Sequence, residues 1–332
     1  NIISVGFLPK KYVQEFYFNQ ILNDPKKLSL FKDGFSRIVE NLDLENIIRK
    51  KLNFKKKIEF NNHHFCHLAS AFYPSGFNKS LIMSLDGIGE FETGMIGIGN
   101  HNKIKVISDA NKFPNSMGLI YAAITNYLGW QSFYDEGIVM GLAPYGTPIY
   151  QEKIVNNLID IKEDGTFRLN QTYFNYVTGL TMTSKKFHDL FGEKPRNSKT
   201  DQLTQFHMDI AASIQKVTED IMIKLVTSLK KEFNIPNLCL AGGVALNCVA
   251  NGKILKEKIF DNIWIQPAAG DAGGSLGAAL ALWYGEQGNE RVVNTNDNMR
   301  GSYLGPEFSQ DQIEKELKSI GANYEVVNYE NL

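Results

Sequence analysis

The sequence has few cysteines and no strong excess of charge of either sign. It contains three cysteines among 332 residues, Cys66, Cys239 and Cys248, and no Cys-x-x-Cys pair. An odd, widely spaced set argues against a disulfide-stapled secreted domain and favours a reducing, cytoplasmic setting. The net charge is −1 and no long Lys/Arg run occurs, so nucleic-acid binding through a broad basic face is disfavoured.

Long apolar runs and standard nucleotide-binding fingerprints are also missing. No apolar stretch reaches the roughly 18 residues of a membrane span, and no signal-peptide pattern opens the chain. We therefore expect no membrane partner. Neither a Walker loop nor a Gly-x-Gly-x-x-Gly fingerprint occurs. The chain opens without Met, at Asn1, in a strand-like run, and this suggests a fragment of a longer protein.

Histidines, in contrast, are concentrated in one place. Half of the six histidines lie within five residues, as His63, His64 and His67. On a helix capped by Asn62, His63 and His67 share one face, one turn apart, the spacing at which two imidazoles bind one metal ion. His64 points about 100° away by helix geometry, so we expect it to support the site or to face substrate. The simpler alternative is a pair of buried, hydrogen-bonded histidines.

Two carboxylates follow apolar strands further along the chain. Asp86 follows the strand-like residues 81–85, and Asp271 lies in the glycine-rich residues 267–277. A simpler alternative is that Asp86 belongs to a hairpin turn. For Asp271 the simpler alternative is that it caps the helix that follows it. Strand-to-helix junctions of one doubly wound sheet meet at one edge, so we expect both to join His63 and His67. Two nitrogens and two oxygens suit Fe(II), Mn(II) or Zn(II) better than Mg(II) or Ca(II).

Glycine-rich turns accompany both carboxylates. Gly87 follows Asp86, Gly270 precedes Asp271, and residues 240–247 place Gly242 and Gly243 between a strand and a helix, with Asn247 beyond. Glycines at such junctions let a ligand approach the backbone, and a helix N-terminus favours phosphate. The alternative is a turn that needs glycine for its own geometry. We interpret these positions as nucleotide contacts.

The order of predicted elements indicates an α/β fold with two units. Residues 80–284 read as an antiparallel three-stranded meander, a helix at 117–130, a long helix at 205–233, and then strand, helix, strand, helix. Residues 131–200 show little regular pattern and are interpreted as an insertion. Residues 1–79 read as strand, helices with a break at 23–25, strand and helix, the remainder of an earlier copy. This order predicts actin- or hexokinase-like, ribonuclease-H-like duplicated units, the first incomplete.

Five segments together resemble one enzyme family, the O-carbamoyltransferases of antibiotic and nodulation-factor biosynthesis. They are residues 62–72, 84–90, 141–146, 242–247 and 267–277, in the family's order. A more distant similarity is to the tRNA threonylcarbamoyladenosine transferases. In this resemblance residues 285–332 are a linker and the start of a C-terminal YrdC-like domain. The resemblance implies that this domain, which makes carbamoyl-adenylate from carbamoyl phosphate and ATP, belongs to the family but not to these 332 residues.

The resemblance implies a chemistry and a set of residues. By position, His63, His67, Asp86 and Asp271 would hold iron, and Asp86 would serve catalysis. The adenosine of carbamoyl-adenylate would lie against Gly242, Gly243 and Asn247, while a hydroxyl of a small sugar- or polyketide-like acceptor attacks the carbamoyl carbon. His64 is our hypothesis for the base. Family members often have Lys where this chain has Ile138, which predicts a difference in nucleotide or acceptor contact.

Three other functions remain open at this point. A threonylcarbamoyl transferase acting on tRNA predicts a basic surface and a shorter chain. A non-catalytic nucleotide- and metal-binding module would carry the same motifs. A sugar kinase of the same fold class would not need paired histidines. The sequence does not identify the acceptor or the metal. It also leaves open whether the chain forms a homodimer.

Overall fold

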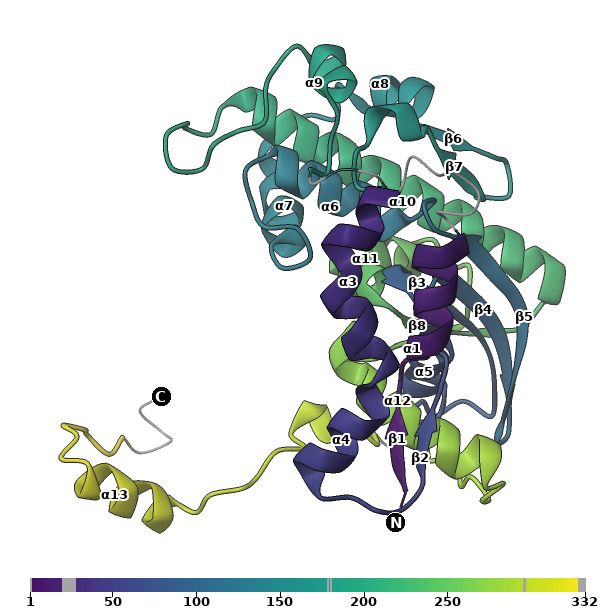
Figure 1. Ribbon diagram of the computed structural model, residues 1–332, viewed down its shortest axis with the longest axis vertical. Helices are drawn as coiled ribbons and strands as arrows, with labels where there is room; N and C mark the ends of the chain where they lie inside the picture. The colour runs from purple at the N-terminus through teal and green to yellow at the C-terminus, as the bar shows by residue number, and fades with distance from the viewer. Residues whose placement is uncertain (1, 20–27, 178, 180, 295–296, 328–332) are drawn as a thin grey trace.

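A five-stranded sheet organises the structure, a computed structural model that describes residues 2–19, 28–177, 179, 181–294 and 297–327 (Figure 1). Its strand order is β5-β4-β3-β8-β9. The strands are β3 (Lys79–Gly89), β4 (Glu92–Asn100), β5 (Lys103–Lys112), β8 (Asn237–Ala241) and β9 (Asn262–Ile265). β3, β4 and β5 pair antiparallel, whereas β8 lies parallel to β3 and β9 parallel to β8. The predicted mixed α/β fold and its meander are confirmed.

Helices cover both faces of this sheet because its central strands are apolar on both sides. Along β3, Leu81, Met83 and Leu85 belong to one buried cluster and Ile82 to another, the alternation of a pleated strand. The first cluster includes residues of α6 (Met117–Tyr127), α10 (Gln205–Phe233) and α11 (Cys248–Lys256). The second packs α5 (His63–Phe72) against the opposite face, and α12 (Gly274–Leu280) lies against α5.

The remaining helices and strands lie outside the five-stranded sheet. They are β1 (Ile3–Val5), α1 (Pro9–Tyr12), α3 (Leu28–Leu42), α4 (Leu44–Leu52), β2 (Ile58–Phe60), α7 (Glu136–Leu142), α8 (Gln151–Asn157), β6 (Ile159–Ile161), β7 (Phe167–Leu169), α9 (Lys185–Phe191) and α13 (Gln310–Ser319). β1 and β2 form a separate parallel pair. The expected order of strand, helices, strand and helix in residues 1–79 is therefore present. The break expected at 23–25 lies outside the described residues.

Three local predictions were wrong. Residues 131–200 are not irregular, because α7, α8, α9 and the β6–β7 hairpin lie there and contribute Ile154, Phe187 and others to the main core. The expected turn at 86–90 continues β3 to Gly89, with an irregular register after Leu85. The helix expected from residue 244 begins as a 3-10 turn (Gly243–Leu246), and α11 starts only after Asn247, whose side chain caps it.

The segment expected to be a polar linker is anchored by one arginine. Arg291 is buried, and its guanidinium stacks on the Phe72 ring at 4.4 Å. Its nitrogens donate to five carbonyl oxygens at 2.7–3.1 Å, those of Phe72, Tyr73, Ser75, Phe77 and His101. A cation at these carbonyls complements the C-terminal end of α5. Arg291 therefore fixes the far end of the helix that carries the histidines.

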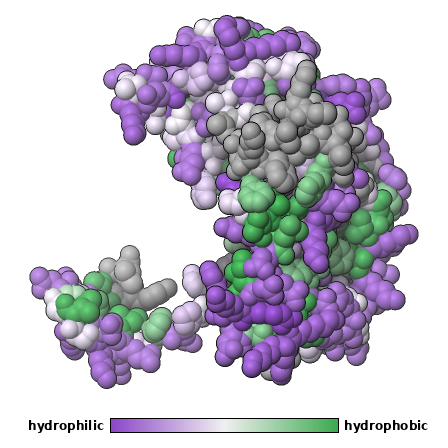
Figure 2. Space-filling view, in the orientation of Figure 1, coloured by the Kyte–Doolittle hydropathy of each residue, from purple (hydrophilic) through white to green (hydrophobic). Residues whose placement is uncertain are grey.

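Beyond Met299, which is itself buried, the chain leaves the body of the molecule. α13 lies away from the sheet in Figure 1 and buries none of its residues. Figure 2 shows apolar side chains on this arm and a hollow in the surface beside α7. Tyr303, Leu304 and Phe308 are among the exposed apolar residues of the arm. None of the helices in the described part of the chain has the length and apolar character needed to cross a bilayer.

Replacing Arg291 by Ala should lower the free energy of unfolding by roughly 3 kcal/mol or more, because buried carbonyl groups lose a charged donor. Chemical denaturation followed by circular dichroism measures this change. Arg300→Ala is the control, since Arg300 is exposed and such surface changes usually stay within about 0.5 kcal/mol. Equal midpoints for the two variants would contradict the anchoring role.

Candidate metal centre and adjoining pocket

The first two residues of the site lie on one face of helix α5. The Asn62 side chain caps this helix by accepting from the Phe65 N–H at 2.9 Å, as the sequence predicts. One turn separates His63 from His67, and their Nε2 atoms are 3.0 Å apart. His67 is fully buried and the His63 side chain is 12% exposed. Both imidazoles therefore present the same nitrogen to one point.

A carboxylate that the sequence interpretation passed over fixes the start of α5. Glu90 is 1% exposed and accepts from the backbone N–H groups of Leu8 at 2.7 Å and His63 at 3.2 Å. Its other oxygen accepts from the Asn62 amide at 3.1 Å. Burial raises the pKa of Glu90. A carboxylate at a helix N-terminus satisfies N–H groups that lack intrahelical partners. The sequence offered a signal for this residue, because Glu90 is the last residue of the Asp-Gly-Ile-Gly-Glu motif at residues 86–90.

Asp86 joins the sheet to the histidines. Its Oδ1 accepts from the backbone N–H groups of Gly87 at 2.7 Å and Gly243 at 3.1 Å. Its Oδ2 lies 2.9 Å from His67 Nε2 and 3.2 Å from His63 Nε2. Asp86 thus uses one oxygen to fix its own orientation and directs the other at both imidazoles.

Asp271 reaches the same point from the far end of the chain. It begins the 3-10 turn Asp271–Gly273 before α12, and its Oδ1 lies 3.4 Å from His63 Nε2 and 3.7 Å from His67 Nε2. Its side chain is 80% exposed, whereas the other three are 0–13% exposed. Hydrogen bonds to His63 and His67 lower its pKa. The four residues meet as expected, and the cluster is open on the Asp271 side.

The geometry and charge of this cluster fit a transition-metal ion. One ligand atom from each residue lies within 4.8 Å of the other three. For metal–ligand distances of about 2.0–2.2 Å, neighbouring ligand atoms lie roughly 2.9–3.6 Å apart. The closest contacts here run from 2.9 to 3.7 Å. Burial disfavours a charged imidazole, yet hydrogen bonds to Asp271 and Asp86 raise the pKa of His63 to about 10. The paired carboxylates therefore favour a cation at this point.

His64 does not face this point or the neighbouring pocket. It is fully buried, with Nδ1 3.0 Å from Ser84 Oγ and Nε2 3.0 Å from the Glu92 carbonyl oxygen. Burial lowers its pKa to about 4. Both ring nitrogens are already occupied, so the hypothesis that His64 is the base for an acceptor hydroxyl does not fit its placement. It joins α5 to β3 and β4.

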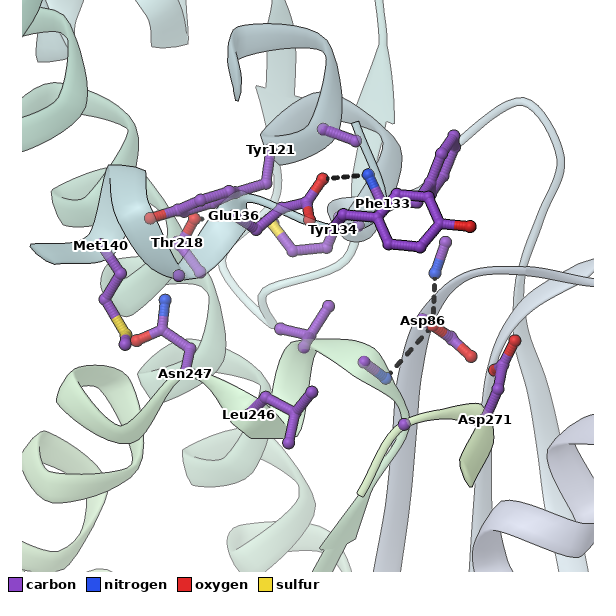
Figure 3. Close-up of a pocket in the computed structure, with 18 of the residues that line it drawn as sticks. Asp86, Tyr121, Phe133, Tyr134, Glu136, Met140, Thr218, Leu246, Asn247 and Asp271 are labelled. Carbon is purple, nitrogen blue, oxygen red and sulfur yellow. Dashed lines mark hydrogen bonds between the residues drawn. The ribbon is translucent and has the colours of Figure 1, made fainter. Parts of the chain in front are cut away.

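A pocket of about 670 Å³ adjoins the two carboxylates (Figure 3). Four of the five residues interpreted as nucleotide contacts line it: Gly87, Gly243, Asn247 and Gly270. Gly242 does not. It has a φ of +84°, and a Cβ there would lie 2.2 Å from the Leu85 carbonyl oxygen. Gly242 is therefore required because the turn lies close to β3. For this glycine the alternative applies, in which the turn needs glycine for its own geometry.

Several pocket residues were missed from the sequence. They are Tyr121, Phe133, Tyr134, Glu136, Met140 and Thr218, on α6, α7, α10 and the loop before α7. Adjacent aromatic residues in the polar stretch 131–136 were a usable signal. Ile138 is not among the lining residues, although Glu136, Gly137 and Met140 of the same helix are. The position at which the resemblance predicts Lys therefore lies outside the lining of this pocket.

A polar network closes the end of the pocket away from the carboxylates. Asn247 and Gln215 exchange two hydrogen bonds, at 2.9 and 3.1 Å, and the Tyr121 hydroxyl donates to Gln215 at 3.1 Å. Gln215 also donates to the buried Glu219, which is ion-paired with Lys253. The Asn247 side chain is thus held in place before any ligand arrives.

The chain is similar to known proteins over most of its length. Residues 8–280 match the family described as carbamoyltransferase N-terminus. An uncharacterized protein of Synechocystis sp. is 50% identical over 93% of this chain and 52% of its own length. Nodulation protein NolNO of Sinorhizobium fredii is 35% identical over 81% of this chain and 37% of its own. Nodulation protein NolO of Bradyrhizobium diazoefficiens is 35% identical over 80% of this chain and 45% of its own length.

The chain thus spans about half or less of the length of each of these relatives. Among solved structures, the crystal structure of HypF from T. kodakarensis aligns with 72% of this chain and 38% of its own. The TM-score is 0.37 and the sequence identity 14%, a likeness too weak to support an argument.

Replacing Gly89 by Ala should displace His63, because a Cβ at Gly89 would lie 2.2 Å from its ring. The expected loss is about 1–3 kcal/mol of unfolding free energy, measured by denaturant titration. Gly252→Ala is the matched control, since nothing lies within 4 Å of its Cβ. It should stabilise α11 by up to about 1 kcal/mol. A Gly89→Ala protein as stable as the parent would show that His63 is not confined.

Proposed function

The chain belongs to the carbamoyltransferase N-terminus family, and we propose that it carries the transfer site of a metal-dependent O-carbamoyltransferase. The observation that supports this most directly is the convergence of His63, His67, Asp86 and Asp271 beside a ligand-sized pocket. A volume of about 670 Å³ lies within the roughly 300–1,000 Å³ typical of small-molecule sites. A structural histidine pair would need neither the exposed Asp271 nor this pocket.

The proposed reaction moves a carbamoyl group from carbamoyl-adenylate to a hydroxyl. A bond forms between the acceptor oxygen and the carbamoyl carbon. The bond from that carbon to the AMP phosphate oxygen breaks, and AMP leaves with the electron pair. The hydroxyl proton passes to solvent. Negative charge develops on the carbamoyl oxygen during this substitution, so a site that stabilises that charge accelerates it.

His63, His67, Asp86 and Asp271 would hold the metal, Fe(II) in our proposal, with Mn(II) or Zn(II) as alternatives. As a Lewis acid the metal would stabilise charge on the carbamoyl oxygen. The residues around the cluster keep these four side chains aligned. Glu90 holds the start of α5, and the backbone N–H groups of Gly87 and Gly243 hold Asp86. The open side at Asp271 leaves room for substrate.

The adenosine part of the donor is proposed to extend from the carboxylates toward Asn247. Gly243 and Gly270 bring backbone close to the pocket without side chains in the way. Val244, Leu246 and Met140 supply apolar surface there. Asn247 keeps its orientation through Gln215. These features suit a flat base next to a phosphate.

The wider setting of the site is also a proposal. β3–β5 followed by β8, α11, β9 and α12 supports the second unit of an actin-like pair, with residues 2–79 from the first. Carbamoyl-adenylate would come from carbamoyl phosphate and ATP at a YrdC-like domain following residues 285–327. Three free cysteines support a cytoplasmic enzyme. The acceptor would be a small hydroxyl compound, sugar- or polyketide-like.

Purified protein should contain about one transition-metal ion per chain, measured by elemental analysis. Asp271→Asn should weaken metal binding by at least about 10–100-fold, the loss typical of a single supporting partner. It should leave the fold intact because Asp271 is exposed. Asp160→Asn removes an exposed carboxylate elsewhere and should change nothing. Metal retained after both His63→Ala and His67→Ala would refute the site.

The full-length protein, supplied with carbamoyl phosphate, ATP and candidate hydroxyl acceptors, should release AMP and pyrophosphate and form a carbamoylated product. Chromatography of nucleotides and mass spectrometry of the acceptor measure this. The metal-site variant Asp271→Asn should reduce product formation at least tenfold, with Asp160→Asn unchanged. ADP as the sole nucleotide product would instead indicate a kinase, and no turnover with metal bound would indicate a non-catalytic module.

A further inference from the structure

One turn beside the pocket has an unfavourable backbone conformation. Phe133 has a φ of +70°, a left-handed value that is costly for a bulky side chain. The Phe133 N–H donates to Glu136 Oε1 at 2.6 Å. Two residues earlier, the Gln131 N–H donates to Asp135 Oδ2 at 2.8 Å, so a second carboxylate holds the same turn. Strain that the surroundings maintain in this way is found mainly at functional sites, which points to a role for Phe133 other than folding.

The ring of Phe133 lies over the backbone that follows Asp86. A Cβ built on Gly87 would be 3.5 Å from Phe133 Cε1, and Phe133 lines the pocket together with Asp86 and Asp271. In Figure 3 it lies with Tyr134 on the Asp86 side of the pocket. Phe133 is 57% exposed, so its burial contributes little to folding. An apolar ring therefore borders the carboxylates of the proposed metal centre.

A carbamoyl donor bound at this centre faces a competing reaction with water. Water carries a hydroxyl group, as the acceptor does, and can form a bond from its oxygen to the carbamoyl carbon. The bond from that carbon to the AMP phosphate oxygen then breaks, AMP leaves with the electron pair, and one water proton passes to solvent. The other product is carbamic acid, which decomposes to ammonia and carbon dioxide. Because Asp271 is 80% exposed, residues at this mouth have to limit the access of water from that side.

We propose that Phe133 is a water shield, whose ring covers the carbamoyl group of the bound donor on the side that faces solvent. This inference rests on the carbamoyltransferase function proposed above, and it concerns the choice between water and an acceptor hydroxyl, whatever the acceptor is. Phe133 acts by its position, since a hydrocarbon ring neither donates nor accepts a proton. The hydrogen bond to Glu136 keeps the ring over Gly87. Tyr134, which also lines the pocket, extends the apolar surface. A shield of this kind prevents hydrolysis of a reactive group.

The test uses full-length protein supplied with carbamoyl phosphate and ATP but no acceptor, so that water is the nucleophile. AMP release is measured by chromatography. Phe133→Gly and Phe133→Asn remove the ring and tolerate the left-handed backbone, so their denaturation midpoints should not fall by more than about 2 °C. Phe133→Tyr keeps a ring at this position and is the conservative variant. Tyr145→Ala, which removes a 71% exposed aromatic residue outside the pocket lining, is the control.

We expect Phe133→Gly and Phe133→Asn to raise AMP release without acceptor roughly 5- to 10-fold. Phe133→Tyr and Tyr145→Ala should match the parent protein. The KM values for ATP and carbamoyl phosphate should stay unchanged in all four variants, because the ring shields the donor without selecting it.

AMP release that stays at the parent level, or decreases, in a folded Phe133→Gly or Phe133→Asn protein would overturn the proposal. A larger fall in the denaturation midpoints of both variants would overturn it as well, since the ring would then serve the fold. A parent protein that releases no AMP even with candidate hydroxyl acceptors present would instead contradict the carbamoyltransferase function itself, which is a separate result.

Discussion

The contact on which the site depends is the one between Asp86 Oδ2 and the two imidazoles of α5. It joins the C-terminal part of β3 to a helix on the opposite face from α6 and α10, at 2.9 and 3.2 Å. Two backbone N–H groups fix the other oxygen of the same carboxylate. Because a buried carboxylate is stable only when it is paired and hydrogen-bonded, these partners cannot move independently. Asp86 thus sets the position of α5 relative to the sheet.

The rest of α5 is fixed from both ends to preserve that contact. Glu90 holds the first N–H group of the helix, that of His63, and Arg291 holds its last carbonyl groups. His64 joins the middle of the helix to Ser84. These interactions are buried, where each hydrogen bond is strong and each unsatisfied group is costly. The rigid part of the site is therefore the buried part, and the exposed Asp271 is the side left open for exchange with solvent or substrate.

The pocket, like the cluster of His63, His67, Asp86 and Asp271, has a fixed side and an open side. Its inner end is made of α6, α10 and the turn after β8, elements that share the main core. Its mouth comes from the loop before α7, in the region interpreted from the sequence as an insertion. Loops on a rigid scaffold are where binding preferences vary most easily. The pocket therefore combines an inner end built on the core with a mouth built on a loop.

The sequence by itself determined the local features. Asn62, His63 and His67 predicted a capped helix with two imidazoles on one face, and the apolar run at residues 81–85 predicted a buried strand. Those inferences succeed because helix and strand periodicity depend on neighbours within a few residues. Tertiary structure alone decided that Asp271 lies 3.4 Å from His63, that His64 is enclosed, and that Phe133 faces Gly87. Contacts across tens or hundreds of residues depend on how the layers pack, which no local pattern encodes.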